Sequence, residues 1–124
     1  MTGKGSRDKG ANGERELARL LKDFYGFDVR RGQVFNGEPD LVGLDGIHVE
    51  VKRVERLNVN DAMEQSREAA KKKQDGVPVV IHRRNRTRWM VTMDLQDWVD
   101  FYLGWLGDEE YTLDEIEEEL FRDE

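Results

Sequence analysis

Three residues in the first half of the chain have the types and spacing that metal-assisted phosphodiester chemistry requires. Asp40 follows Pro39 at the start of a short apolar run, and Glu50 and Lys52 stand in a second apolar run after nine intervening residues. Hard divalent cations such as Mg²⁺ commonly take one or two carboxylates together with water and phosphate. The metal polarises the phosphoryl oxygen and generates hydroxide, while a lysine orients that nucleophile or neutralises developing charge.

A β-hairpin would bring these residues together. Leu44-Asp45-Gly46 lies between the two apolar runs, and Asp-Gly flanked by alternating hydrophobic residues is a strong hairpin signal. Residues two apart on a strand share a face, so Glu50 and Lys52 should project together with Asp40 nearby. The alternative is an exposed salt-bridge cluster that contributes little stability. Spacing alone favours this alternative.

The residue census narrows the kind of metal site that the chain can build. The sequence has no cysteine and two histidines, His48 and His82, which excludes disulfides, thiolate zinc sites and histidine-rich metal sites. Any metal must therefore be held mainly by carboxylates and backbone oxygens.

Charge is distributed unevenly along the chain. The net charge is −7, but residues 1–93 carry +5 and residues 94–124 carry −12. This asymmetry indicates a body that binds a polyanion and an acidic C-terminal appendage. No segment reaches the roughly 18 apolar residues of a membrane span, and the N-terminus lacks a signal-peptide apolar region, so we expect a cytoplasmic protein with no membrane partner.

Hydrophobic periodicity predicts the elements that must position the candidate residues. An amphipathic helix is expected over residues 11–25, with Glu14 near the margin of its apolar stripe. A carboxylate there could face a metal site, although acidic residues are also simply favoured in a first helical turn. Strands are expected over 27–31, on both sides of the 45–46 turn, and over 77–82 and 89–93. Further helices are expected over 60–73, from residue 94 onward and around 113–121.

This order of elements predicts an α/β fold in which helices flank a mixed β-sheet. We expect three parts: a flexible basic arm over residues 1–10, a catalytic domain over 11–106, and an acidic helical segment over 107–124. The helix over 60–73 is expected to connect two strands as a crossover.

The order Glu14, Pro39-Asp40, Glu50-Val51-Lys52 resembles the signature of the PD-(D/E)XK nucleases. Glu14, within Gly-Glu-Arg-Glu-Leu-Ala-Arg-Leu-Leu, is similar to the further acidic residue of archaeal and phage Holliday-junction resolvases. The similarity covers roughly residues 9–93. It implies a restriction-endonuclease-like fold and a structure-selective DNA endonuclease that leaves 5′-phosphate ends. It also implies a homodimer acting on four-way junctions, in a bacterial, phage or archaeal setting.

The resemblance also assigns roles to the candidate residues. Asp40, Glu50, the Val51 carbonyl and Glu14 are expected to bind Mg²⁺, for which Mn²⁺ should substitute. Lys52 is expected to activate water, and Glu14, Asp40, Glu50 and Lys52 together form the expected catalytic set. In related resolvases a polar residue of the loop before the Pro-Asp motif, often serine, contributes to activity; this chain has Gln33 and Asn36 there, so that role does not transfer.

Basic and polar residues around this site are expected to contact DNA, because guanidinium and ammonium groups bind phosphate. The densest group is the tip between the last two strands, with four arginines in six residues. The full expected set is Lys4, Arg7, Lys9, Arg30, Arg31, Gln33, Arg53, Arg56, Lys72, Arg83, Arg84, Arg86 and Arg88.

Two other functions remain open from the sequence. One is a nicking or repair endonuclease that uses the same site on a different DNA shape. The other is a DNA-binding module that keeps the nuclease fold without catalysis.

Overall fold

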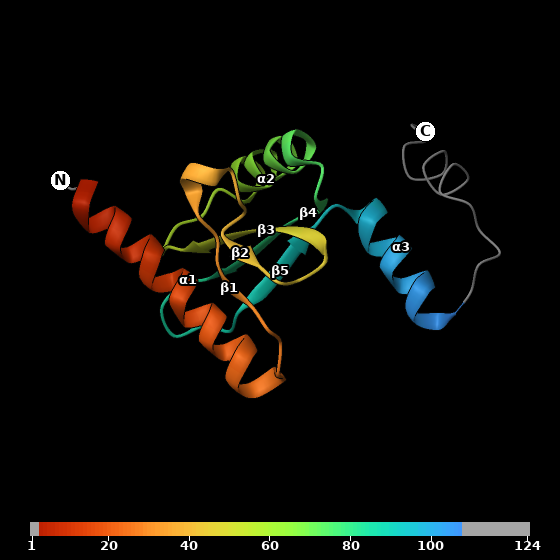
Figure 1. Cartoon of the computed structure of the whole chain (residues 1–124), viewed down its shortest axis with the longest axis horizontal. Helices are drawn as coiled ribbons and strands as arrows, with labels where there is room; N and C mark the ends of the chain where they lie inside the picture. Colours follow the sequence, from red (N-terminus) through yellow and green to blue (C-terminus); the bar gives the residue numbers. More distant parts are fainter. Residues whose placement is uncertain (1–2, 108–124) are drawn as a thin grey trace. The chain divides into compact units, whose positions relative to one another are not determined.

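A computed structural model describes residues 3–107, with side chains from residue 10 onward (Figure 1). It contains three α-helices, five strands and one short 3₁₀ helix within those residues. The elements are α1 (Gly3–Tyr25), β1 (Arg30–Arg31), the 3₁₀ helix η1 (Val34–Asn36), β2 (Leu41–Val42), β3 (Gly46–Arg53), α2 (Val59–Lys73), β4 (Gly76–Arg83), β5 (Met90–Met93) and α3 (Leu95–Leu106).

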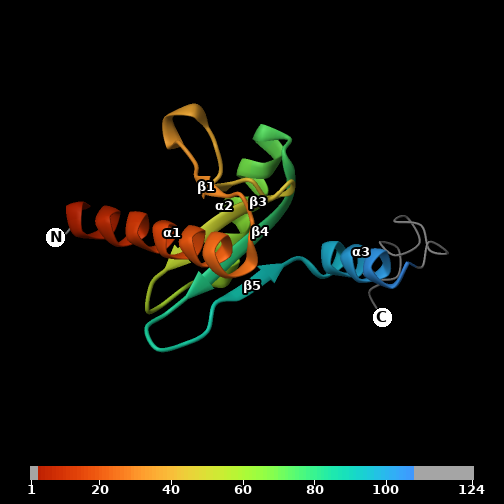
Figure 2. The ribbon, with the colours of Figure 1, turned by 60° about the horizontal axis from the view of Figure 1, so that its bottom comes forward.

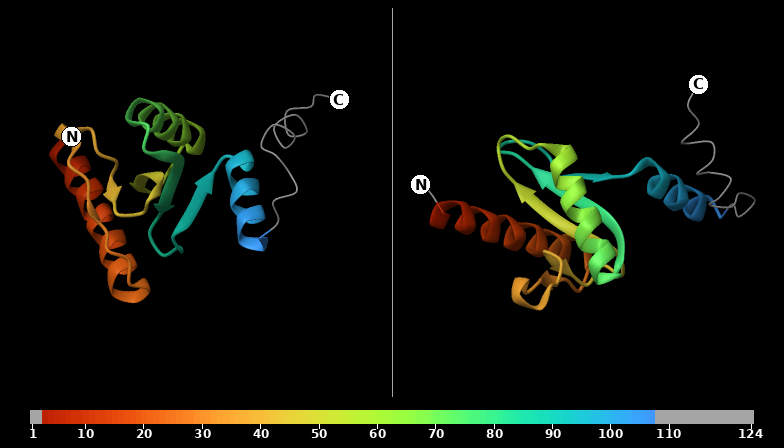
Figure 3. Two further views of the ribbon diagram at one scale, coloured as in Figure 1. Left: turned by 45° about the vertical axis from the view of Figure 1, so that its right-hand side comes forward. Right: turned by 90° about the horizontal axis from the view of Figure 1, so that it is seen from above.

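The five strands form one mixed sheet in the order β1-β2-β3-β4-β5. β1, β2 and β3 pair antiparallel, with Leu41 opposite Val49. β3 and β4 pair in parallel over eight residues, from Gly46 opposite Gly76 to Arg53 opposite Arg83. Parallel neighbours need a crossover connection, and α2 supplies it, running alongside both strands (Figure 3). The predicted mixed sheet and crossover are confirmed.

α1 and α2 cover opposite faces of the sheet (Figure 2). On one face Val80 packs against Ala62 and Met63 of α2. The residues at odd positions of β3 point to the other face, where α1 crosses the strand and Leu17 of α1 is buried. Apolar strand residues fill both sides, as expected for strands covered on two faces.

The first helix begins earlier than the sequence predicted. α1 starts at Gly3 instead of Ala11, so residues 3–10 are helical and do not form the predicted arm without regular structure. No proline or β-branched residue stands between Gly3 and Gly10. Once the helix around Leu17 is held by the sheet, each further turn adds hydrogen bonds without a new nucleation cost. In contrast, the strand predicted over 27–31 is reduced to Arg30–Arg31.

The chain separates into two compact units, Met1–Thr92 and Met93–Glu124. The described part of the second unit is α3, in which Trp98 and Tyr102 stack with ring centroids 5.2 Å apart. The helix predicted around 113–121 lies outside the described residues. The predicted domain limits at residues 10 and 106 stay predictions. Within the described part of the chain, no helix is both long and apolar enough to cross a membrane.

α1 lies directly against β3 at Gly13. A Cβ atom at Gly13 would overlap the Cβ of Arg53, whereas a Cβ at Gly10 would meet no atom within 4 Å. Glycine at position 13 therefore allows the helix to lie directly on the strand that carries the candidate catalytic residues.

Two glycine-to-alanine variants of α1 should have opposite effects on stability. Gly10→Ala should raise the free energy of unfolding by about 0.5–1 kcal/mol, because alanine favours a helix interior. Gly13→Ala should lower it by about 1–3 kcal/mol, because the added methyl overpacks the junction of helix and strand. Urea unfolding of both variants measures this difference. Equal gains in the two variants would show that α1 does not lie this close to β3.

Candidate active site

Asp40 immediately precedes β2, next to β3. β2 begins at Leu41, so the edge of β3 beyond Val49 has no strand partner there. The Asp40 backbone N–H donates to the Val49 carbonyl over 3.0 Å. Its carboxylate oxygen Oδ2 accepts the Val51 N–H over 2.8 Å, which satisfies a backbone donor that the ladder would otherwise leave unpaired. The side chain of Asp40 is thus fixed against the middle of β3.

Gly32 supports this placement from the other side. Its N–H donates to the Asp40 carbonyl over 2.9 Å. A Cβ at Gly32 would collide with the Pro39 carbonyl oxygen. Only glycine lets the chain after β1 lie this close to the Pro-Asp pair.

Glu50 and Lys52 share one face of β3, as the sequence predicted. Glu50 is 7% exposed, whereas Lys52 is half-buried. A buried carboxylate on a strand does not fit the alternative of an exposed salt-bridge cluster. The peptide of Val51 lies between Glu50 and Lys52, with its N–H bound to Asp40. The proposed metal-ligating role of the Val51 carbonyl stays a prediction.

Glu14 reaches the same region from α1. Its Oε2 accepts hydrogen bonds from Arg31 Nε and Nη2 over 3.2 and 3.1 Å. Leu17, one turn further along, is 2% exposed and anchors this part of the helix to the core. The structure therefore places Glu14 of α1 and Glu50 of β3 each within interaction distance of Asp40.

The three carboxyl groups influence one another electrostatically. Burial, followed by the charge of Asp40 and hydrogen bonding with it, raises the pKa of Glu50 to about 8, while Lys52 lowers it and Glu14 adds a smaller increase. Burial and the Asp40 charge also raise the pKa of Glu14, opposed by Arg31. Such crowding of negative charge in a partly buried place is relieved by a bound cation.

The donor set suits a hard divalent cation held by few protein ligands. Among the described residues, no three His, Asp or Glu side chains converge closely enough to form a metal cage. Asp40 instead interacts pairwise with Glu50 and with Glu14. Mg²⁺ commonly uses one or two carboxylates and completes its shell with water and phosphate. Asp40 and Glu50 would be the two ligands, with Glu14 close by and engaged with Arg31.

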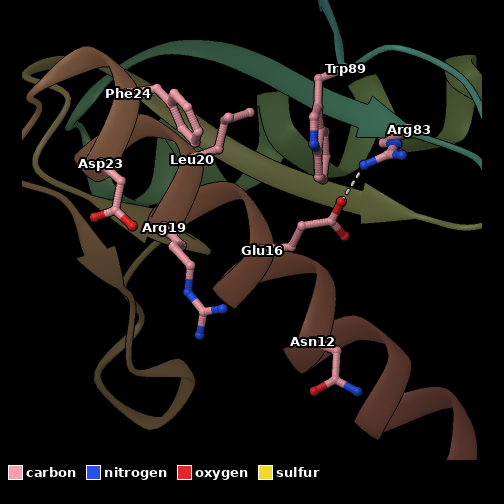
Figure 4. Close-up of a pocket in the computed structure, with 8 residues that line it drawn as sticks. All are labelled: Asn12, Glu16, Arg19, Leu20, Asp23, Phe24, Arg83 and Trp89. Atoms are coloured by element: carbon pink, nitrogen blue, oxygen red, sulfur yellow. Dashed lines mark hydrogen bonds and ion pairs between the residues drawn. The ribbon is translucent and has the colours of Figure 1, made fainter.

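Four arginines predicted to contact DNA are bound to carboxylates. Arg30 pairs with Glu38 over 2.8 Å, and Arg31 pairs with Glu14. Arg53 and Arg83, adjacent in the parallel register, both bind Glu16 of α1, Arg53 through Nε over 3.2 Å. Figure 4 shows Glu16 between α1 and Arg83, beside a cavity of about 470 Å³ that Trp89 and Phe24 also line. To bind phosphate, each of these arginines must either bind it alongside its carboxylate partner or release that partner.

The other predicted DNA-binding residues lie at the surface. Gln33, Arg56, Lys72, Arg84, Arg86 and Arg88 are exposed or nearly so. The tip between β4 and β5 is held in one shape, because Thr87 Oγ1 and N–H both bond with Arg84 and the Asn85 N–H donates to Glu55. Lys4, Arg7 and Lys9 belong to the first turns of α1; their side chains are not described.

Sequence reasoning missed two residues next to the site. His48 is 1% exposed and lies on the same face of β3 as Glu50. Asp75, in the connection from α2 to β4, is bonded to His48. His48 lies two residues before Glu50, so the alternation rule that placed Lys52 on the same face as Glu50 also predicts that face for His48. Nothing in the sequence pointed to Asp75.

One solved structure supports the family resemblance. No protein-family model and no curated protein sequence matches this chain. The structure of Hjc, a Holliday junction resolvase from the archaeal hyperthermophile Archaeoglobus fulgidus, is similar to this chain with a TM-score of 0.51. The two are 27% identical, and the match covers 68% of this chain and 72% of that chain. The predicted resolvase resemblance and restriction-endonuclease-like fold are confirmed.

The raised pKa of Glu50 predicts how the stability of the metal-free protein depends on pH. Between pH 4.5 and about 8, the folded state holds a proton on Glu50 that the unfolded state has lost. The free energy of unfolding should therefore fall as pH rises through this window, because the folded state binds more protons. Glu50→Gln should remove that contribution. The difference in melting temperature between Glu50→Gln and wild type should therefore grow in favour of the variant from pH 5 to pH 9.

Thermal unfolding in the presence of a chelator measures this effect. Asp40→Asn should reduce the same slope in part, since it removes a charge that raises the pKa of Glu50. Parallel pH profiles for wild type and Glu50→Gln would contradict the electrostatic description of the site.

Proposed function

We propose that this chain is a metal-dependent, structure-selective DNA endonuclease that resolves four-way junctions. The observation that carries the proposal is the pairwise interaction of Asp40 with Glu50 and with Glu14 beside the central strand β3, with Lys52 on the same face as Glu50. The similarity to an archaeal Holliday junction resolvase supports the substrate class.

Each residue of the site has a role in the proposed hydrolysis. Asp40 and Glu50, with the Val51 carbonyl, would hold Mg²⁺ or Mn²⁺, which supplies phosphoryl polarisation and a metal-activated nucleophile when bound. Lys52 orients the attacking water or neutralises charge that develops on the phosphate. Glu14, held by Arg31, completes the acidic site directly or through water. Hydrolysis would leave 5′-phosphate and 3′-hydroxyl ends.

A junction requires two symmetric cuts, and a C₂ homodimer offers two equivalent sites. We therefore propose a homodimer acting on DNA in a cytoplasmic, bacterial, phage or archaeal setting. The basic body over residues 1–93 would face DNA.

A second candidate function is a nicking or repair endonuclease of the same fold. The same four site residues would serve it, since the metal chemistry does not depend on the overall shape of the DNA. A DNA-binding module without catalysis is less well supported, because a site that held no cation would gain nothing from burying Glu50 beside Asp40.

Cleavage assays distinguish these functions. Purified protein with Mg²⁺ or Mn²⁺ should cut a four-way junction in preference to matched duplex and single-stranded DNA, and a chelator should stop the reaction. Asp40→Asn and Glu50→Gln should each lower the cleavage rate by at least about 100-fold, while junction binding persists. Asp45→Asn, in the exposed hairpin turn of the same strands, is the matched control and should cut normally.

Other outcomes assign other functions. Equal cleavage of all three DNA substrates would refute junction selectivity and leave a nuclease. Binding without cleavage in every divalent metal would indicate the non-catalytic module.

The arginine tip between β4 and β5 should bind phosphate. Replacing Arg84 and Arg86 with alanine should weaken binding to all DNA sequences alike and reduce the slope of log affinity against log salt by about one for each phosphate that the protein no longer neutralises. Arg67→Ala, on the exposed part of α2 where Arg67 pairs with Glu64, is the control. An unchanged salt slope in the double variant would show that the tip does not touch phosphate.

A further inference from the structure

His48 is the most deeply buried ionisable residue among the described side chains, at 1% exposed. Its Nδ1 lies 2.7 Å from Asp75 Oδ1. Its Nε2 is buried without a hydrogen-bond partner and lies 3.7 Å from Glu50 Oε1. Buried polar atoms are nearly always paired, so the unpaired Nε2 beside a proposed metal ligand requires an explanation.

Strand geometry directs the ring at Glu50. His48 precedes Glu50 by two residues on β3, and positions two apart share a face. The backbone at His48 is held within the parallel β3–β4 ladder, opposite Pro78. Ser66 of α2 lies within hydrogen-bond distance of the His48 carbonyl, at 3.3 Å. The ring therefore has little freedom to turn toward another acceptor.

Asp75 fixes the ring from the opposite side. It lies in the connection between α2 and β4, and its side chain is about three-quarters buried. Nδ1 lies against this carboxylate, which leaves Nε2 directed at Glu50. The 3.7 Å separation exceeds hydrogen-bond length by about 0.5–1 Å, so a small rotation of the Glu50 side chain would bring its Oε1 within bonding distance.

We propose that His48, held by Asp75, is a positioning residue that orients the Glu50 carboxylate toward a divalent cation. Nδ1 of the ring faces Asp75 and Nε2 faces Glu50, so the His48 ring bridges the two carboxyl groups. A hydrogen bond to one Glu50 oxygen leaves the other directed at the cation. Carboxylates that bind metals are themselves commonly held by such hydrogen bonds, and losing the partner typically lowers metal affinity about 10- to 100-fold. The inference rests on the proposed metal-dependent function.

A purely structural role for His48 would rest on its bond to Asp75, and amide substitutions separate the two roles. The Asn amide nitrogen lies near the position of Nδ1 and the Gln amide nitrogen near that of Nε2. His48→Asn therefore keeps a donor for Asp75 and loses the one for Glu50. His48→Gln keeps a donor for Glu50 and loses the one for Asp75.

The experiment is a calorimetric titration of Mn²⁺ into the full chain without DNA, alongside thermal unfolding with a chelator. We expect His48→Asn to bind Mn²⁺ about 10- to 100-fold more weakly than wild type, and His48→Gln to recover most of that loss. His82→Asn is the matched control for loss of a buried histidine, because His82 bonds with Thr92 of β5 and stands opposite Lys52, not Glu50, in the β3–β4 register; its Mn²⁺ affinity should equal that of wild type.

The proposal is overturned if the two His48 variants bind Mn²⁺ as wild type does, or if their affinities only follow their melting temperatures. It is also overturned if wild type binds no Mn²⁺. Failure of the nuclease function would appear differently, as absence of cleavage in a wild-type protein that still binds Mn²⁺ with the predicted order among the variants.

Discussion

The arrangement of the site depends on one hydrogen bond on the central strand β3, from the Val51 N–H to the Asp40 carboxylate. β2 consists of two residues, so the ladder along β3 would stop at Val49 and leave a backbone donor without a partner. The Asp40 side chain takes that place. A group that completes the secondary structure is thereby set beside Glu50.

Neighbouring cations offset the repulsion between these carboxyl groups. Arg31 is bound to Glu14, and Lys52 lowers the pKa of Glu50 against the effect of burial. Two residues after Glu14 on the same helix, Glu16 takes up Arg53 and Arg83 on the other side of α1. α1, which lies on β3 at Gly13, therefore holds basic partners through its acidic side chains on two of its sides. Part of the basic charge of the body is bound in ion pairs within the fold, whereas the arginine tip between β4 and β5 is exposed.

Local rules predicted the elements that carry the site, because the Asp-Gly turn, strand alternation and helical periodicity act over a few residues. They placed Asp40 beside Glu50 and assigned Lys52 to the same face, and the resemblance built on them is confirmed. They did not predict that α1 begins at Gly3, because helix extension depends on anchoring elsewhere. Ion pairs between distant residues, such as Glu16 with two arginines, leave no local pattern. The bond between His48 and Asp75 joins residues 27 apart, and only the tertiary structure reveals it.

The central claim is that the edge of β3 holds a divalent cation, and anomalous diffraction from crystals grown with Mn²⁺ tests it most directly. We predict an anomalous peak bonded to carboxylate oxygens of Asp40 and Glu50, at roughly 2.0–2.3 Å as for other hard cations, with the Val51 carbonyl in or near the coordination shell. A peak at full Mn²⁺ occupancy on other carboxylates, with none at this edge, would contradict the claim.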